Sequence, residues 1–216
     1  MVQKIWFYSS EEKSVRLEGI LSFQRDKRNQ PVVILCHPHP LYGGDMNSSV
    51  IVAIEKALLE NGYSTLKFNF RGVGNSEGFY GHGILEEKDL EGAIAFALKN
   101  EYIKPRNIIL VGYSFGAKVA FKVSLKNPNI SHLITIGLRS NYPEEIKFKI
   151  KNSQIKICFL AGELDRGAND FTELKKFCKK YNLYCESALI EGADHFFNRN
   201  LNRLVEEVLK FLKGFK

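Results

Sequence analysis

A serine between two glycines joins an apolar run to a helical pattern, and this junction constrains the fold more than any other stretch. The apolar residues 108–111 precede Gly112-Tyr113-Ser114-Phe115-Gly116, and residues 117–121 continue in a helical pattern. In a tight turn from strand to helix, the serine hydroxyl stands above the sheet, and the crowded positions two residues away favour glycine. We therefore expect a buried strand, an accessible Ser114 hydroxyl and a helix whose N-terminus faces it.

The rest of the chain alternates between strand and helix patterns. Near the N-terminus, two runs at 2–8 and 14–23 flank a short polar segment, which predicts an antiparallel hairpin. The remaining strands are expected at 32–36, 64–70, 108–111, 132–136, 155–161 and 184–190. Helices are expected at 47–59 (with Asn47 or Ser48 as the cap), around 90–98, from 117, at 171–181 and at 201–212. This alternation predicts an α/β fold of one domain, residues 1–216, with a mostly parallel eight-stranded sheet that carries helices on both faces.

Composition and charge exclude several classes of protein. With 44% hydrophobic and 25% charged residues, the chain resembles an ordinary globular domain, and no apolar run is long enough to span a membrane. The first residues lack the apolar core of a signal peptide, so we expect a cytoplasmic protein without membrane contact. The net charge of +7 comes from lysines interleaved with core-type residues, which favours a solvated surface over nucleic-acid binding. We expect a monomer or a homodimer.

Ser114 requires a base, because a serine hydroxyl is a poor nucleophile at neutral pH. The predicted strand 184–190 leads into Gly192-Ala193-Asp194-His195, and the strand before it leads into Gly162-Glu163-Leu164-Asp165. The carboxyl ends of parallel strands lie at one edge of a sheet, so we expect Ser114, His195 and Asp165 to meet there as nucleophile, base and orienting acid. Other candidates remain open at this point: Glu163 or Asp170 as the acid, and His82 or His132 as a less attractive base.

Acyl transfer also requires two N–H donors for the developing oxyanion. The residue after the serine, Phe115, is expected to supply one backbone N–H, and the loop after strand 32–36 the other. That loop reads His37-Pro38-His39-Pro40-Leu41, and prolines have no N–H group. The second donor is therefore expected to be His39, with Leu41 as the alternative.

Metal binding is a weaker interpretation of the same loop. Cys36, His37 and His39 could act as ligands, but no further ligands follow at the spacings that zinc sites use. The four cysteines, at positions 36, 158, 178 and 185, are expected to be free thiols. We expect no metal and no cofactor.

Taken together, these motifs resemble the α/β-hydrolase superfamily, and more narrowly a group of small hydrolases related to dienelactone hydrolases and serine esterases. They are His37-Pro38-His39-Pro40 with Gly43-Gly44, residues 69–78, Gly112–Gly116, residues 162–165 and residues 192–197. The resemblance implies an α/β-hydrolase fold whose first two strands form an antiparallel edge. Dienelactone hydrolases are similar but carry cysteine in place of Ser114, so the resemblance does not imply a dienelactone substrate.

The resemblance also suggests what the enzyme acts on. Between 138 and 154, where lipases and esterases insert a cap, the chain is too short for a helical lid, which implies an open, shallow pocket without a substantial lid. Hydrolysis of small carboxylic esters or thioesters is the favoured function. A peptidase or amidase, or a non-catalytic binding protein with this fold, is the alternative. Arg71 could bind a substrate carboxylate or phosphate, although a structural salt bridge is favoured for it.

Overall fold

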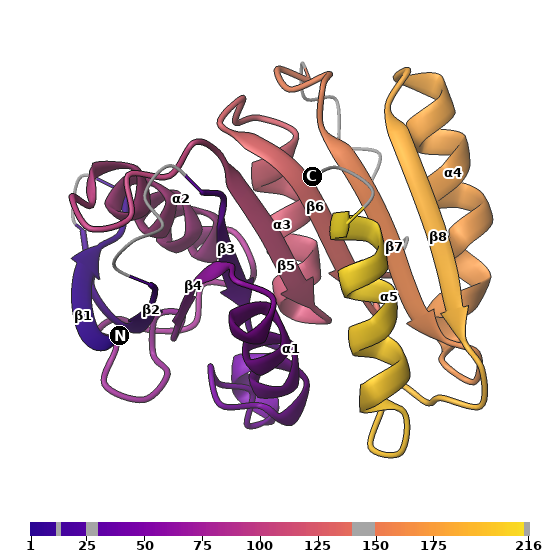
Figure 1. Cartoon of the computed structure of the whole chain (residues 1–216), viewed down its shortest axis with the longest axis horizontal. Helices are drawn as coiled ribbons and strands as arrows, with labels where there is room; N and C mark the ends of the chain where they lie inside the picture. The colour runs from indigo at the N-terminus through magenta and orange to yellow at the C-terminus, as the bar shows by residue number, and fades with distance from the viewer. Residues whose placement is uncertain (12–13, 25–29, 140–149, 214–216) are drawn as a thin grey trace.

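We describe the protein from a computed structural model that covers residues 1–11, 14–24, 30–139 and 150–213. Its core is one eight-stranded sheet with the strand order β1-β2-β4-β3-β5-β6-β7-β8 (Figure 1). The strands are β1 (Val2–Tyr8), β2 (Arg16–Ser22), β3 (Val32–Cys36), β4 (Ser64–Phe68), β5 (Ile108–Tyr113), β6 (Ile130–Ile136), β7 (Lys156–Gly162) and β8 (Tyr184–Ile190). The predicted α/β-hydrolase fold is confirmed.

The first two strands form the predicted antiparallel hairpin at one edge of the sheet. Their register runs from Val2 opposite Ser22 to Tyr8 opposite Arg16. Strand β2 also pairs antiparallel with β4, whereas all pairs from β4 to β8 are parallel. In β1, side chains alternate between more and less exposed positions, as expected of an edge strand with one face in water.

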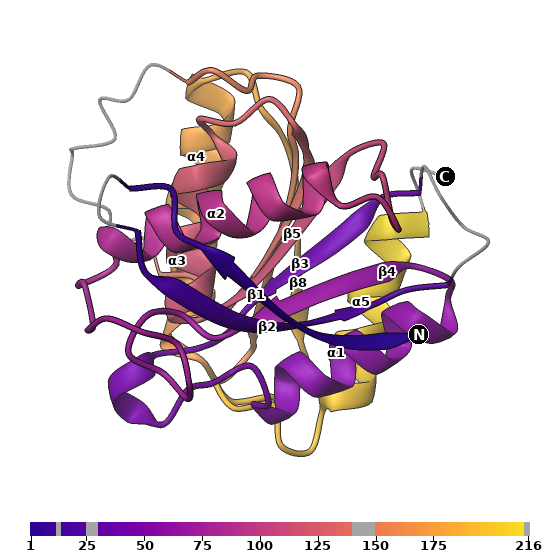
Figure 2. The ribbon, with the colours of Figure 1, turned by 90° about the vertical axis from the view of Figure 1, so that its left-hand side faces the viewer.

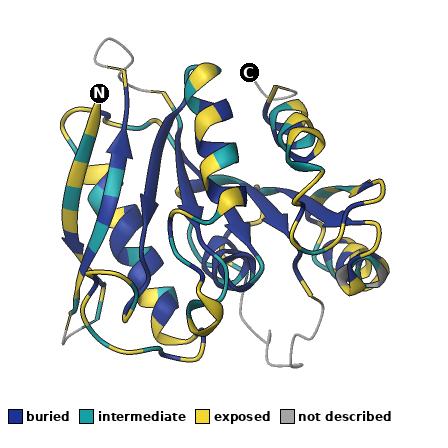
Figure 3. Ribbon diagram, turned by 90° about the horizontal axis from the view of Figure 1, so that it is seen from below, coloured by how far each residue is buried: buried dark blue, intermediate teal, exposed yellow. Residues whose placement is uncertain are grey.

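The central strands β3 and β5 are buried along their whole length, because helices cover both faces of the sheet. Helices α1 and α5 pack on one face, and α2, α3 and α4 pack on the other (Figure 2). The helices are α1 (Ser49–Glu60), α2 (Leu85–Lys99), α3 (Phe115–Ser124), α4 (Phe171–Lys180) and α5 (Leu201–Lys213). Seen from below, the central strands are buried, whereas the N-terminal edge strand and the outer faces of the helices carry exposed residues (Figure 3).

Some element boundaries differ from the sequence-based expectation. Strand β6 begins at Ile130 rather than at residue 132, because Ile130 already pairs with Ile108 of β5. Helix α1 begins after Ser48, whose hydroxyl donates to the carbonyl oxygen of Asp45 at 2.7 Å instead of capping the helix. Strand β5 extends to Tyr113, so the sheet continues up to the residue before the serine.

The segment between β6 and β7 was expected to be too short for a lid. Its middle, residues 140–149, lies outside the described residues. On either side of that gap, residues 137–139 and 150–155 form neither helix nor strand. No helix in the described part of the chain is both long enough and apolar enough to cross a membrane.

Candidate active site

Ser114 occupies a strained turn between β5 and α3. Its φ of 54° and ψ of −111° lie in a region that residues other than glycine rarely adopt. A Cβ atom at Gly116 would lie 2.3 Å from the carbonyl oxygen of Cys36, and one at Gly112 would lie 2.5 Å from that of Gly116. Both positions therefore require glycine. The backbone N–H of Ser114 donates to the carbonyl oxygen of Ile136 at 2.8 Å, which anchors the turn to β6.

The structure brings Ser114, His195 and Asp165 together at the carboxyl edge of the sheet. Ser114 Oγ lies 3.0 Å from His195 Nε2, and Asp165 Oδ2 lies 2.6 Å from His195 Nδ1. The three residues follow β5, β8 and β7, so the parallel strands place them side by side. The Asp165 side chain is buried, whereas the His195 imidazole is 29% exposed, so part of the ring is accessible from outside.

The other acids and bases considered from the sequence have different surroundings. Glu163 accepts a hydrogen bond from the backbone N–H of Gly192 at 2.9 Å and holds the loop that carries His195. Asp170 lies at the N-terminus of α4. The His132 ring contacts the hydroxyl of Ser131 at 2.8 Å near the start of β6, and burial lowers its pKa to about 4. The geometry thus favours Asp165 and His195.

His37 is buried and bonded at both ring nitrogens. Its Nδ1 lies 2.7 Å from the carbonyl oxygen of Pro38, and its Nε2 accepts from the backbone N–H of Phe70 at 3.0 Å. Burial lowers the pKa of His37 to about 4, so the ring is neutral at physiological pH. A ring in this state ties the loop after β3 to the loop after β4, and it has no free lone pair for a metal ion.

In the loop after β3, the two candidate oxyanion donors differ in whether their backbone N–H group is already hydrogen-bonded. The backbone N–H of Leu41 donates to His39 Nδ1 at 3.2 Å, so it is already occupied. Within the described residues, no hydrogen bond is found for the backbone N–H of His39 or of Phe115. This arrangement favours the N–H of His39 over that of Leu41 as the second oxyanion donor, next to the N–H of Phe115.

Two hollows meet at Ser114. Each has a volume of about 430 to 460 Å³, and His39, Tyr42, Ser114 and His195 line both. The first hollow continues past basic and aromatic side chains of α3 and of the loops after β4 and β6. They are Tyr80, His82, Phe115, Lys118 and Arg139. The second continues past uncharged residues, namely Pro38, Gly43, Gly44, Ser48, Ser49, Tyr113, Phe196 and Asn198.

Residues 84–210 match the dienelactone hydrolase family. This match covers more than half of the 216 residues and includes Ser114, Asp165 and His195. The chain belongs to the dienelactone hydrolase family. It is therefore a hydrolase of the α/β-hydrolase superfamily.

Relatives of this family member cover nearly its whole length. An uncharacterized protein of Rickettsia prowazekii is 32% identical over 206 residues, which make up 91% of this chain and 84% of that protein. The structure of an α/β serine hydrolase homologue from Coxiella burnetii is 29% identical, with a TM-score of 0.79 and 97% of each chain covered. A protein of unknown function from Agrobacterium tumefaciens, described as a candidate α/β hydrolase, is 26% identical, with a TM-score of 0.85 and coverage of 98% and 95%.

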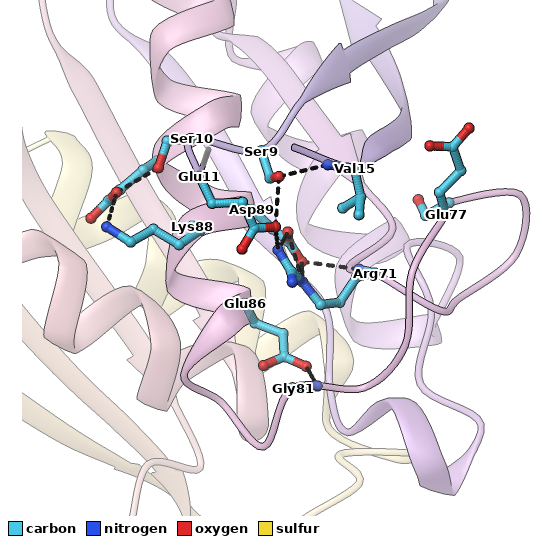
Figure 4. A network of polar contacts seen from close by, with 12 residues as sticks. Ser9, Ser10, Glu11, Val15, Arg71, Glu77, Gly81, Glu86, Lys88 and Asp89 are labelled. Atoms are coloured by element: carbon cyan, nitrogen blue, oxygen red, sulfur yellow. Dashed lines mark hydrogen bonds and ion pairs between the residues drawn. The ribbon is translucent and has the colours of Figure 1, made fainter. Parts of the chain in front are cut away.

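Arg71 of this dienelactone hydrolase family member does not line either hollow. Its guanidinium is buried against Asp89, with Nη2 at 2.7 Å from Oδ1, and against Glu11 at 2.6 Å (Figure 4). Burial alone would raise the pKa of Glu11, but the hydrogen bonds from Arg71 and Ser9 outweigh it and lower that pKa. With its donors directed at two carboxylates, Arg71 has the structural role that the sequence favoured, and the substrate-binding role loses support.

Two tyrosines near the serine had no signal in the sequence. The Tyr113 hydroxyl donates to the carbonyl oxygen of His195 at 2.9 Å, and the Tyr80 hydroxyl lies 3.2 Å from His39 Nε2. These pairs are separated by 82 and 41 residues. No local pattern marks contacts of this kind.

Proposed function

We propose that the chain is a serine hydrolase that cleaves small carboxylic esters or thioesters through an acyl-enzyme on Ser114. The observation that carries this proposal is the continuous chain of contacts from Ser114 Oγ through the His195 imidazole to Asp165. These contacts support the roles of nucleophile, base and orienting acid for Ser114, His195 and Asp165, because acyl transfer requires the three groups in this order and at such distances. No cofactor is needed for this chemistry.

In the first half-reaction, His195 Nε2 takes the hydroxyl proton while Ser114 Oγ attacks the carbonyl carbon. The resulting tetrahedral intermediate collapses when the protonated imidazole gives that proton to the leaving alcohol or thiol. Water then attacks the acyl-enzyme, again with His195 as the base, and releases the acid and the free serine. Throughout, Asp165 holds Nδ1 in the protonated form and stabilises the positive charge on the ring.

The backbone N–H groups of Phe115 and His39 are proposed to stabilise the oxyanion. Phe115 is the first residue of α3, so its N–H also benefits from the positive end of the helix dipole. The size of the hollows suits small substrates, and the serine hydrolase name of the Coxiella burnetii relative agrees with this reaction class. The proposed binding partner is a small-molecule ester. We further propose that the protein acts as a monomer or homodimer and binds neither nucleic acid nor a membrane.

Hydrolysis of p-nitrophenyl acetate and p-nitrophenyl butyrate tests the proposal. The Ser114→Ala variant should lose activity by on the order of 10⁴-fold or more, because the nucleophile is removed. Ser10→Ala is the matched control, since the Ser10 hydroxyl contacts Glu91 on the surface, and it should retain activity. A fluorophosphonate probe should label the wild type at residue 114 only. Full activity in Ser114→Ala, or no labelling of folded wild type, would rule the proposal out.

A further inference from the structure

Tyr80 connects two loops at the wall of the first hollow. It follows β4 in the chain, and its hydroxyl lies 3.2 Å from His39 Nε2 in the loop after β3. The Tyr80 ring packs 5.3 Å from the His39 ring and 5.8 Å from that of Phe115, the residue next to Ser114. Since Tyr80 and Ser114 line the same hollow, a substrate bound to the serine has space to extend towards this phenol.

The contacts of His39 determine which group donates to which. The backbone N–H of Leu41 donates to Nδ1, and a ring nitrogen can accept only when it carries no proton. Burial lowers the pKa of His39, so the neutral ring predominates at physiological pH. Its single proton is then on Nε2 and is donated to the Tyr80 oxygen.

The Tyr80 hydroxyl therefore does not donate its proton to His39. Within the described residues, no acceptor is found for it. The fixed charges on this hollow, Lys118 and Arg139, can only donate hydrogen bonds. Among the described residues, the Tyr80 hydroxyl is therefore a donor on this wall for which no acceptor is found, and the two cations beside it add further donors.

Lys118 differs in this respect from Lys122, one turn further along α3, and from Lys126, which follows the end of that helix. Lys122 Nζ lies 3.0 Å from Glu87, and Lys126 Nζ lies 2.9 Å from the same carboxylate. For Lys118, no carboxylate partner is found among the described residues. The ammonium group of Lys118 therefore adds to the hydrogen-bond donors on the wall of the first hollow.

The position of Tyr80 is fixed by the turn that follows it. The buried carboxylate of Glu86 accepts from the backbone N–H of Gly81 at 2.7 Å (Figure 4). It also accepts from the backbone N–H of Gly83 at 2.7 Å. Between them, His82 has a φ of 58°, a value that needs support from its surroundings. Tyr80 thus meets the hollow on a rigid loop, as a binding group requires.

We propose that Tyr80 is a substrate-binding residue that donates its hydroxyl proton to an oxygen atom of the acyl or alcohol group in the first hollow. The substrate accordingly carries an oxygen acceptor in addition to its ester group. This inference rests on the proposed ester hydrolysis at Ser114.

Two matched pairs of esters test it with the Tyr80→Phe variant, which keeps the ring and removes the donor. On the acyl side, p-nitrophenyl methoxyacetate is compared with p-nitrophenyl butyrate, in which CH₂ replaces the oxygen. On the alcohol side, 2-methoxyethyl acetate is compared with butyl acetate. For each ester, the kcat/KM of the variant is divided by that of the wild type, which cancels differences in intrinsic reactivity. In one of the two pairs, this ratio should show a loss of about 5- to 10-fold in kcat/KM for the oxygen-bearing ester, as expected for one lost hydrogen bond. For the matching alkyl ester, the loss in kcat/KM should be less than about twofold.

Tyr42→Phe is the control, because Tyr42 lines the same hollow but contacts His39 through its ring, at 4.7 Å. It should preserve the ratio within each pair. An equal loss for both members of both pairs, or no loss at all, would overturn the role of Tyr80 and leave ester hydrolysis intact. Failure of the wild type to cleave any of the four esters would overturn both proposals. Nitrogen-15 NMR of the His39 ring should find the proton on Nε2; a proton on Nδ1 would also overturn the inference.

Discussion

The hydroxyl of Tyr113 donates to the carbonyl oxygen of His195 at 2.9 Å and joins the residue before the serine to the proposed base. The Tyr113 ring also packs 5.7 Å from the imidazole. Burial raises the pKa of Tyr113 to about 12, with Asp165 and Asp194 adding to the effect, so the phenol stays a donor at physiological pH. The loop that carries His195 is thus fastened directly to the turn that carries Ser114.

The Tyr113→Phe variant should show what this fastening contributes to the rate. It removes one hydrogen bond worth about 1 kcal/mol, which corresponds to roughly a fivefold loss in kcat if the bond aligns His195. We expect KM to change little, because the hydroxyl proton is already donated to the carbonyl oxygen of His195. Steady-state hydrolysis of p-nitrophenyl acetate measures both constants. Tyr8→Phe, at an exposed position of β1, is the control, and an unchanged kcat for Tyr113→Phe would contradict the expectation.

The proposed oxyanion donor at His39 can be tested by comparing two variants that differ in the backbone N–H at this position. His39 has a φ of −59°, which a proline ring adopts without strain. His39→Pro lacks both the side chain and the N–H, whereas His39→Ala lacks the side chain alone. We expect kcat for His39→Pro to be about 10²- to 10³-fold below that of His39→Ala, the loss typical of one oxyanion donor. Equal rates for the two folded variants would assign the donor to another residue.

Much of this site could be predicted because parallel strands place their carboxyl ends at one edge. Ser114, Asp165 and His195 each follow a strand recognisable from its apolar pattern, so their meeting follows from topology. Strand β8 has the predicted bounds, Tyr184–Ile190. The start of β6 was less predictable, since its pairing with Ile108 of β5 decides it rather than its own residues.

The contacts that support the site could not be predicted, for a different reason. Tyr80 meets His39, and Arg71 meets Asp89 and Glu11, only because irregular loops follow particular paths between the strands. Loop paths depend on individual hydrogen bonds, such as those from Gly81 and Gly83 to Glu86, and these leave no periodic pattern. For Arg71, the sequence named a salt bridge but not its partners.

Loss of the Arg71 guanidinium should destabilise the fold strongly. In Arg71→Met, the buried Asp89 carboxylate would lose its bidentate partner, and a break of this kind costs about 3–5 kcal/mol of unfolding free energy. Lys176→Met breaks an exposed pair with Glu173 and should cost less than about 1 kcal/mol. Urea denaturation measures both values. Similar stability losses in the two variants would show that the Arg71 network is not a major support of the loop after β4.

The unfolding free energy should fall as the pH drops from 6.5 to 4.5, because two histidines are held neutral in the folded protein. Burial lowers the pKa of both His37 and His132 to about 4, whereas histidine in an unfolded chain titrates near 6.5. Within this window the unfolded chain binds protons that the folded protein does not, so acid favours unfolding, by up to about 1.4 kcal/mol per pH unit for each fully buried histidine. The lowered pKa values of Glu11 and Glu18 act in the same direction mainly below about pH 4.5, where these carboxylates are more than half protonated in the unfolded chain. His132→Gln should make the slope between pH 6.5 and 4.5 shallower, by part of that value, since the His132 ring is only partly buried and solvent screens its charge. Urea denaturation at several pH values measures the slope; a flat wild-type profile, or the same slope in His132→Gln, would contradict this account of the buried rings.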